Sequence, residues 1–189
     1  RLFNLLSEML TERQKVFRGG NFSQYFRANG AKYPAVMIVI DNFADFNEKT
    51  DGKYLPFIIR LSKEGSSNGM FLVLSAAAYN SNEIPSRVSS NIGTGICLAL
   101  ADKFAYGDIL HTIRIDVMPE AGMKGRGLAY VGERILELQT ALPLEAEDDY
   151  HRLEAVRAKV RNIKESWQGN TALRIPEIPE HPTWEIFAD

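Results

Sequence analysis

The stretch Pro34-Ala-Val-Met-Ile-Val-Ile-Asp-Asn-Phe-Ala-Asp-Phe46 decides the fold class. Its first seven residues are apolar and rich in β-branched side chains, and the run ends at Asp41. A continuous apolar run of this kind is typical of a parallel strand that is buried on both faces. The pattern therefore predicts a strand that ends in a carboxylate, in a sheet with helices on both sides.

A second apolar run, Met70-Phe-Leu-Val-Leu-Ser75, repeats the pattern. Between the two runs, residues 54–64 are predicted to form a helix, which ends at the turn cluster Gly65-Ser-Ser-Asn-Gly69. Strands that alternate with helices form parallel sheets through right-handed crossovers. The sequence thus predicts an α/β fold with a mostly parallel sheet flanked by helices.

The remaining elements follow from periodicity and turn residues. They are a helix over 2–17, a short helix over 22–27, a short helix over 85–91, a strand over 96–100, a helical turn over 108–111, a hairpin of 125–131 with 135–139, and a charged amphipathic helix over 148–167. That last helix can bind a partner, but its apolar stripe favours packing on the protein's own sheet. The tail over 173–180 contains two prolines and is predicted to be extended.

Composition narrows the class of protein. The chain has 189 residues, 45% of them hydrophobic, and a net charge of −2, which fits one α/β domain with an appendage. The chain lacks the excess of basic residues that a nucleic-acid-binding face usually needs. The lone cysteine, Cys97, excludes an intramolecular disulfide and lies in an apolar run, so we expect a buried thiol in a reducing cytosol. No apolar run has the length of a membrane span.

Chemistry is expected where the two buried strands end, because α/β sheets bind ligands at the carboxyl ends of their strands. Asp41 and Asn42 follow the first strand, and Ser75 follows the second, before Ala76 and Ala77. A carboxylate after an apolar strand is the Walker B arrangement, which orients Mg²⁺ on a bound nucleotide. The same pattern also fits an Asp that caps a loop or the next helix.

The order of several segments adds to this interpretation. They are Arg1–Leu6, Pro34–Phe46, Asn68–Ser75, Ile84–Ile92, Asp102–Leu110, Gly125–Leu128 and the tail Arg174–Glu180. In this order the chain resembles the motor domain of FtsK/SpoIIIE-type ATPases, and among them the EssC/EccC ATPases of type VII secretion. The resemblance implies a RecA-like P-loop NTPase fold over residues 1–145, with a C-terminal helix and Pro-containing tail over 146–189 packing on it.

The chain departs from the family at the positions that carry its chemistry. Asn42 stands where the family has the Glu that polarises the attacking water, and an amide cannot accept a proton. Ala76 and Ala77 replace the Thr-Gln pair that senses the γ-phosphate, and Gly95 and Gly107 replace two arginines. Arginine of this kind contributes about 10³-fold or more to phosphoryl transfer. Asp41 matches the family's Walker B Asp, which orients Mg²⁺. The resemblance implies this role for Asp41 only if the chain binds nucleotide.

The phosphate-binding loop Gly-x-x-x-x-Gly-Lys-Ser/Thr does not occur in these residues. In the family's order it would precede Arg1, so we expect the chain to be a fragment of a longer protein. ATP and Mg²⁺ are then expected in the parent protein and not on this chain. Whether the parent hydrolyses ATP stays open at this point.

The resemblance implies a degenerate, bacterial ATPase module with a structural or regulatory role in protein export. It would lie on the cytoplasmic side of a membrane-anchored protein, with the membrane reached only through upstream segments. Implied partners are sister ATPase modules, a hexameric ring and secreted proteins of the WXG100 kind, and no nucleic acid. The alternative is an ATP-hydrolysing DNA translocase, for which the region over 52–63 is not notably basic.

A few other residues attract attention without forming a motif. His111, His151 and His181 lie in separate segments and are expected at the surface. Asp45 matches a second acidic position of the family, but four residues beyond Asp41 it more simply caps the following helix or faces solvent. Trp167 and Trp184 are candidates for anchoring the tail or a neighbouring module.

Overall fold

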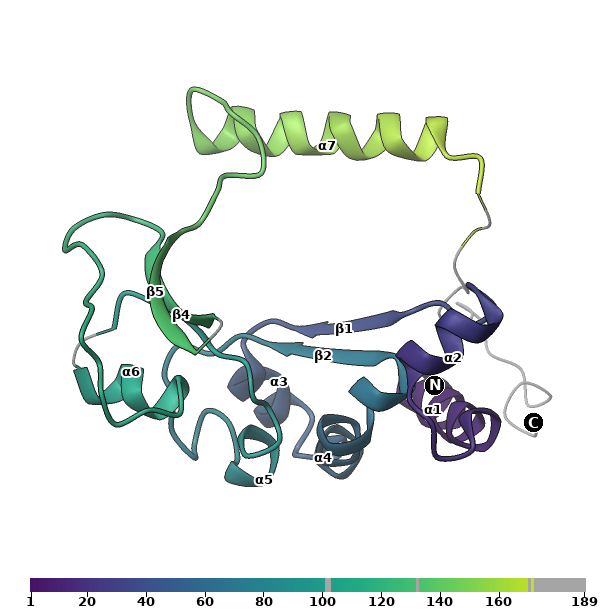
Figure 1. Cartoon of the computed structure of the whole chain (residues 1–189). Helices are drawn as coiled ribbons and strands as arrows, with labels where there is room; N and C mark the ends of the chain where they lie inside the picture. The colour runs from purple at the N-terminus through teal and green to yellow at the C-terminus, as the bar shows by residue number, and fades with distance from the viewer. Residues whose placement is uncertain (101–102, 132, 170, 172–189) are drawn as a thin grey trace. The chain divides into compact units, whose positions relative to one another are not determined.

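The computed structural model describes residues 1–100, 103–131, 133–169 and 171. They form two compact units, of which the first comprises Arg1–Ile96 and Ala101–Ile115, and the second comprises Cys97–Leu100 and the chain from Asp116 on. Each unit is described by itself below (Figure 1). The expected α/β class is confirmed, whereas the division at residues 145/146 stays a prediction. Trp184, His181 and the tail over 173–180 lie outside the described residues.

The first unit begins with two helices. Helix α1 spans Leu2–Phe17, as periodicity predicts. Helix α2 spans Phe22–Asn29 and extends two residues beyond the predicted helix over 22–27. Asn21 caps α2 in a reciprocal capping box with Gln24, which satisfies two backbone donors at the helix start.

A parallel pair of strands forms the centre of this unit. Strand β1, Val36–Ile40, pairs with β2, Met70–Leu74, in the register Val36↔Met70 to Ile40↔Leu74. The connection between them contains α3 (Phe43–Lys49), α4 (Leu55–Glu64) and a 3₁₀ turn η1 (Ser66–Asn68). The sequence pattern did not predict α3, which is only seven residues long and starts directly after the strand.

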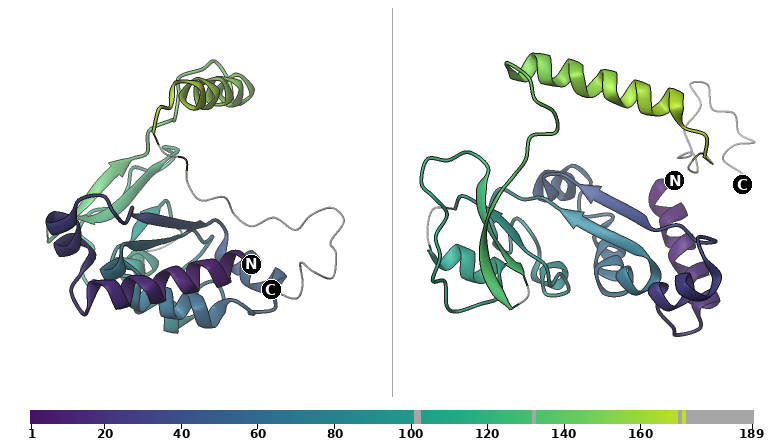
Figure 2. Two further views of the ribbon diagram at one scale, coloured as in Figure 1. Left: turned by 90° about the vertical axis from the view of Figure 1, so that its right-hand side faces the viewer. Right: turned by 45° about the horizontal axis from the view of Figure 1, so that its top comes forward.

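Helices cover one face of this pair of strands (Figures 1 and 2). Leu6 and Leu10 of α1 pack with Leu61 of α4 and with Met70. A second cluster joins Ile40, Phe43, Ile58 and Val88.

The opposite face of the strands is not covered by the rest of the first unit. The side chains that point there are Met37, Val39, Phe71 and Val73, with exposed fractions of 39–69%. Residues alternate between the faces of a strand, so the first unit by itself buries one face of the pair and leaves an apolar face uncovered.

Arg13 is a charged residue buried in this unit, at 2% exposure. Its guanidinium donates to the backbone carbonyls of Asn68 (3.0 Å), Gly69 (3.3 Å) and Pro34 (2.6 Å). Burial lowers the pKa of Arg13 from its usual value. These bonds tie α1 to the amino ends of both strands.

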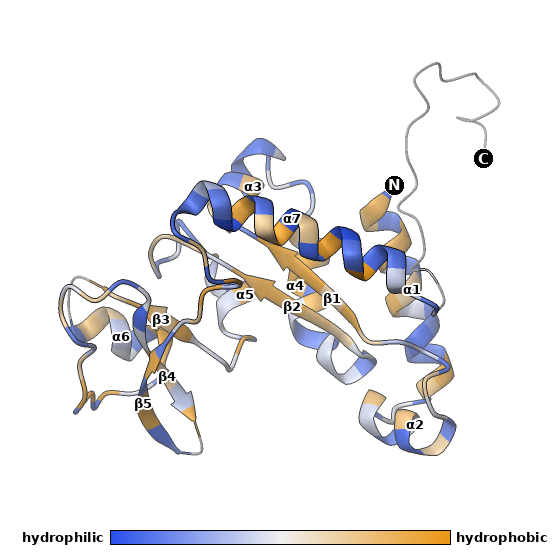
Figure 3. Ribbon diagram, turned by 90° about the horizontal axis from the view of Figure 1, so that it is seen from above, coloured by the Kyte–Doolittle hydropathy of each residue, from blue (hydrophilic) through white to orange (hydrophobic). Residues whose placement is uncertain are grey.

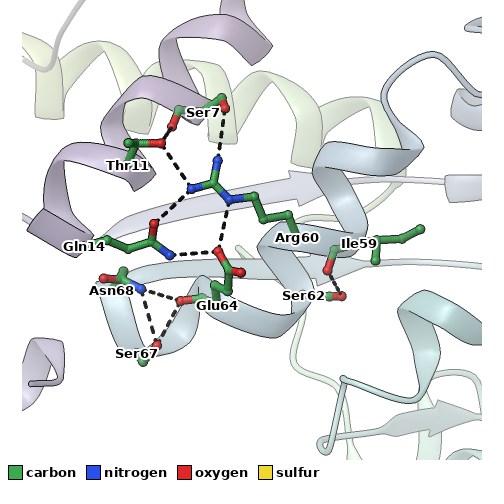
Figure 4. A network of polar contacts seen from close by, with 9 residues as sticks. All are labelled: Ser7, Thr11, Gln14, Ile59, Arg60, Ser62, Glu64, Ser67 and Asn68. Atoms are coloured by element: carbon green, nitrogen blue, oxygen red, sulfur yellow. Dashed lines mark hydrogen bonds and ion pairs between the residues drawn. The ribbon is translucent and has the colours of Figure 1, made fainter. Parts of the chain in front are cut away.

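A second network links α1 to α4 (Figure 4). Arg60 pairs with Glu64 at 3.0 Å and donates to Thr11 (3.1 Å) and Gln14 (2.9 Å), while Gln14 donates to Glu64 at 2.8 Å. The charged groups are therefore bonded across the two helices that cover the strands.

The rest of the first unit contains α5 (Ser86–Ser89) and α6 (Lys103–Ile109). The predicted helical turn over 108–111 was wrong in its bounds, because α6 begins earlier and ends at Ile109. Tyr106, at 1% exposure, anchors α6 in place.

The second unit is built on a sheet in the order β3-β4-β5. Strand β3 (Ile96–Leu98) lies beside the hairpin of β4 (Arg126–Val131) and β5 (Arg134–Gln139), which confirms the predicted hairpin. The strand expected over 96–100 thus belongs to this second sheet and not to the β1–β2 pair. Cys97 is buried as expected, and burial raises its pKa to about 11. Helix α7 (Asp149–Ser166) follows, with Asp148 as its N-cap.

Candidate functional site

The candidate site lies where β1 and β2 end. Because the strands are parallel and Ile40 is paired with Leu74, the residues that follow them, Asp41 and Ser75, lie side by side. The predicted site residues Asn42, Ala76 and Ala77 follow directly and, like Asp41 and Ser75, are exposed.

Ser75 links the two strand ends. Its hydroxyl donates a short hydrogen bond to Asp41 Oδ1 and accepts one from the backbone N–H of Asn42 at 2.9 Å. Its carbonyl accepts from the N–H of Phe43 at 2.9 Å, and its own N–H donates to Ile40 at 3.1 Å. The sequence named Ser75 only as a polar residue at this edge. A hydroxyl directly opposite the Asp in a parallel register is the signal that predicts the contact.

Asn42 has a structural role at this edge. Its backbone is left-handed, with φ 51° and ψ 73°, and its side chain accepts from the N–H of Asp45 at 3.4 Å as the N-cap of α3. Asn is favoured over Glu both in the left-handed region and at an N-cap. The amide that stands at the family's glutamate position thus fits the local backbone.

Asp45 interacts with its own helix α3 and not with Asp41. Its carboxylate pairs with Lys49 at 2.9 Å along α3, and this hydrogen bond raises the pKa of Lys49. An exposed pair at this spacing contributes little to stability. Asp45 therefore serves α3 and makes no carboxylate pair with Asp41.

Gly95 and Gly107 are both closely packed in the first unit. A Cβ on Gly95 would lie 2.6 Å from the backbone oxygen of Ile109, and a Cβ on Gly107 would lie 2.7 Å from that of Thr112. Both distances are too short for any side chain. An arginine at either position would thus require a different local backbone. The packing around both positions therefore fits glycine and excludes a side chain.

The residues at this edge do not fit ATP and Mg²⁺ on their own. Mg²⁺ in nucleotide sites takes one or two carboxylates together with phosphates that a loop holds in place. Asp41 is the carboxylate at this edge and already accepts from Ser75. The described part of the chain contains no cluster of three His, Cys, Asp or Glu residues that could hold a metal ion.

The histidines of the described residues have separate partners. His111 Nε2 lies 3.2 Å from the carbonyl of Ile92, and His151 Nδ1 lies 2.8 Å from Asp148. A pocket of about 480 Å³ beside α6 is lined by Lys103, Gly107, Asp108 and His111, among others. Of the predicted site residues it includes only Gly107, so it is distinct from the strand ends. No helix among the described residues has the length and apolarity needed to cross a membrane.

We compared the sequence and the fold of the chain with those of known proteins. No protein-family model matches the chain. The type VII secretion system protein EssC of Staphylococcus aureus (strain MRSA252) is 25% identical over 179 residues, which is 93% of this chain and 12% of that protein. The chain spans about an eighth of the length of the curated relatives that it matches.

Two solved structures share the fold. EssC (ATPases 2 and 3) from Geobacillus thermodenitrificans gives a TM-score of 0.77 at 22% identity, over 99% of this chain and 35% of that one. Thermomonospora curvata EccC (ATPases 2 and 3), in complex with a signal sequence peptide, gives 0.71 at 21% identity, over 94% and 32%. The resemblance seen in the sequence is confirmed: the chain is similar to the EssC/EccC ATPases of type VII secretion and shares the RecA-like P-loop fold of their solved ATPase domains.

Proposed function

We propose that the chain is a degenerate ATPase module of a type VII secretion motor, with a structural or regulatory role in protein export and little or no ATP hydrolysis. The observation that carries this proposal is Asn42. Its amide cannot accept a proton from water, and its side chain and left-handed backbone are used to start α3.

The neighbouring positions support the same conclusion. Ala76 and Ala77 have no polar group to place on a phosphate. Gly95 and Gly107 lack the charge that stabilises phosphoryl transfer, and their surroundings leave no room for a side chain. A module that keeps the fold and Asp41 but lacks the reactive groups suits a role in assembly.

The partners that fit this role are sister ATPase modules of the same polypeptide, in a hexameric ring on the cytoplasmic side of the membrane. Secreted proteins of the WXG100 kind are the proposed cargo. The signal sequence peptide in the Thermomonospora curvata EccC structure supports the idea that a module of this fold can receive an export signal.

The test measures nucleotide binding and turnover in the longest natural polypeptide that contains this sequence. A fluorescent ATP analogue is titrated with Mg²⁺, and phosphate release is followed at saturating ATP. In a polypeptide with several modules, Asp41→Asn reports on the contribution of this module to ATP turnover. We expect the variant to leave the turnover unchanged. Micromolar binding with turnover that Asp41→Asn abolishes would contradict the proposal.

Duplex DNA provides a separate test of the rival function. A DNA motor is expected to bind duplex DNA with an affinity that falls steeply between low and moderate salt, because cations are released from the phosphates. We expect no such binding by this chain, whose net charge is −2. Steep salt-dependent binding would favour a DNA translocase instead.

A further inference from the structure

Helix α7 carries its large aliphatic side chains on one narrow line. They are Leu153, Val156, Val160 and Ile163, at alternating spacings of three and four residues, and Trp167, the C-cap of the helix, follows four residues later. Strict alternation of this kind is the seam of a coiled coil, whereas a helix that covers a sheet has a wider apolar face. We call these five residues the α7 seam. Asp149 occupies the same line in the first turn, so the seam begins at Leu153.

The rest of the second unit does not cover the α7 seam. Leu153, Val160, Ile163 and Trp167 are 48–62% exposed, and no residue of α7 is buried. Figure 3 shows orange turns recurring along a largely blue helix. The packing of this stripe on the protein's own sheet stays a prediction, because α7 and the β1–β2 pair belong to different units. A row of large exposed apolar side chains marks an interaction surface.

The residues on both sides of the seam are basic. Arg152 and Lys159 flank one side, and Arg157 and Lys164 flank the other, as a spacing of 100° per residue places them. The acidic residues Glu154 and Glu165 fall on the opposite face of the helix by the same spacing. The flanks of the seam thus present one sign of charge.

These cations are not all equally available. Arg152 is held by Asp149 and by the carbonyl of Leu144 at 3.2 Å. Arg157 pairs with Glu154 at 2.7 Å, an exposed contact that costs little to exchange. Lys159 and Lys164 form no ion pair within the described residues.

Charge decides what can pack on the seam. In a parallel pair of α7 helices the flank on one side would face the opposite flank of the partner, and in an antiparallel pair each flank would face its own copy. Both arrangements set cations against cations, which disfavours a second copy of this helix. A membrane surface is disfavoured because an interfacial helix needs a broad apolar face, and this seam is narrow.

We propose that α7 is a docking helix for an amphipathic α-helix of a partner protein whose own apolar seam is flanked by acidic side chains. Seam packs on seam, and carboxylates of the partner lie against Arg157, Lys159 and Lys164. This inference rests on α7 alone and stands whether or not the module hydrolyses ATP.

The experiment uses a fluorescent three-heptad peptide with Ile and Leu at its seam positions and Glu on both flanks. Its own carboxylates repel one another and keep it from pairing with itself. Binding to the full chain is followed by anisotropy. We expect the affinity for this acidic peptide to fall as salt rises. We expect the affinity for a matched peptide with Lys flanks to be lower by a factor of about ten or more.

Variants of exposed residues keep the test separate from folding. Lys159→Glu combined with Lys164→Glu is expected to reverse the preference between the two peptides, and Ile163→Asp is expected to abolish binding of both. Arg161→Glu, outside the flanks, serves as the matched control and is expected to change the affinity of the acidic peptide by less than about threefold. Circular dichroism checks that each variant keeps its helix.

Three outcomes would overturn the proposal. Equal affinity for the two peptides would mean that the flanks do not select the partner. Binding of neither peptide would mean that the seam does not dock a helix. Stronger binding to phosphatidylserine vesicles than to the acidic peptide, lost in the Lys159→Glu, Lys164→Glu variant, would assign α7 to a membrane surface.

Discussion

The two ends of the β1–β2 pair are built in opposite ways. At the amino ends, a buried arginine donates three hydrogen bonds to carbonyls of Pro34, Asn68 and Gly69. At the carboxyl ends, Asp41, Asn42 and Ser75 are exposed, and the polar contacts that the structure shows among their side chains stay within the edge and the start of α3. A buried charge is tolerated only where it is fully engaged, so the amino ends are organised for stability.

Under the proposed function, the carboxyl ends would have lost the chemistry of the site, while the amino ends keep the fold stable. The carboxyl edge is where an α/β sheet binds its ligand, and here its polar groups hold the loop and α3 together. Substitutions there are expected to have small effects on folding, whereas changes at the closely packed positions are expected to have large ones. The four predictions below test that contrast.

The largest effect is expected for Arg13→Met. The substitution keeps much of the side-chain volume and leaves buried carbonyls without donors, at about 1–3 kcal/mol for each unsatisfied group. Because the Nε of Arg13 is itself buried without a partner among the described residues, part of that cost is offset. We expect the free energy of unfolding to fall by about 3 kcal/mol, measured by urea denaturation.

Lys15→Met is the matched control, since Lys15 is exposed on the same helix two residues further on. It is expected to change the free energy of unfolding by less than about 0.5 kcal/mol. If both variants lower the free energy of unfolding equally, the hydrogen bonds of the buried guanidinium do not stabilise the amino ends of the strands.

The next effect is expected for Gly95→Ala. A Cβ there would meet the backbone oxygen of Ile109 at 2.6 Å and its Cγ2 at 2.7 Å, and overpacking of this kind costs about 2 kcal/mol. Gly93→Ala is the control, because nothing lies within 4 Å of a Cβ at Gly93. If thermal denaturation shows equal stability for the two variants, Gly95 is not fixed by packing and its lost arginine has no structural cause.

The sequence predicted the elements that are long and regular better than it predicted the site. The helix over 2–17, both parallel strands and the hairpin follow from apolar periodicity and turn residues, which depend on local sequence alone. The seven residues of α3 were missed because so short a helix has hardly two turns of periodicity. The bounds of α6 were wrong for a similar reason, since its anchor Tyr106 depends on tertiary burial.

The site itself was only partly predictable. The sequence placed Asp41, Asn42 and Ala76 at the ends of strands, because a buried run and its end are visible in the residues. It could not show that Asn42 is left-handed or that Gly95 faces the carbonyl of Ile109, since both depend on backbone paths from distant segments.

A smaller effect is expected for Asn42→Glu, which restores the residue type of the family. The change removes the side-chain cap of α3 and places a longer side chain in the left-handed region, for a combined cost of about 1 kcal/mol. Asn42→Asp keeps both properties and is expected to be nearly neutral. Urea denaturation of the two variants side by side checks the difference, and a stabilising Asn42→Glu would remove the structural reason for the amide.

The smallest effect is expected for Ser75→Ala. The hydroxyl bonds Asp41 and the N–H of Asn42, but all three residues are exposed, so water can replace it at nearly equal enthalpy. We expect a loss of about 0.5 kcal/mol in the free energy of unfolding. A loss as large as that of Arg13→Met would show that the carboxyl edge is as structural as the amino edge, and the contrast between the two ends would fail. A small loss leaves Asp41 held in place by a bond that the fold does not require, which is the state expected of a ligand site that has kept its shape after losing its reactive groups.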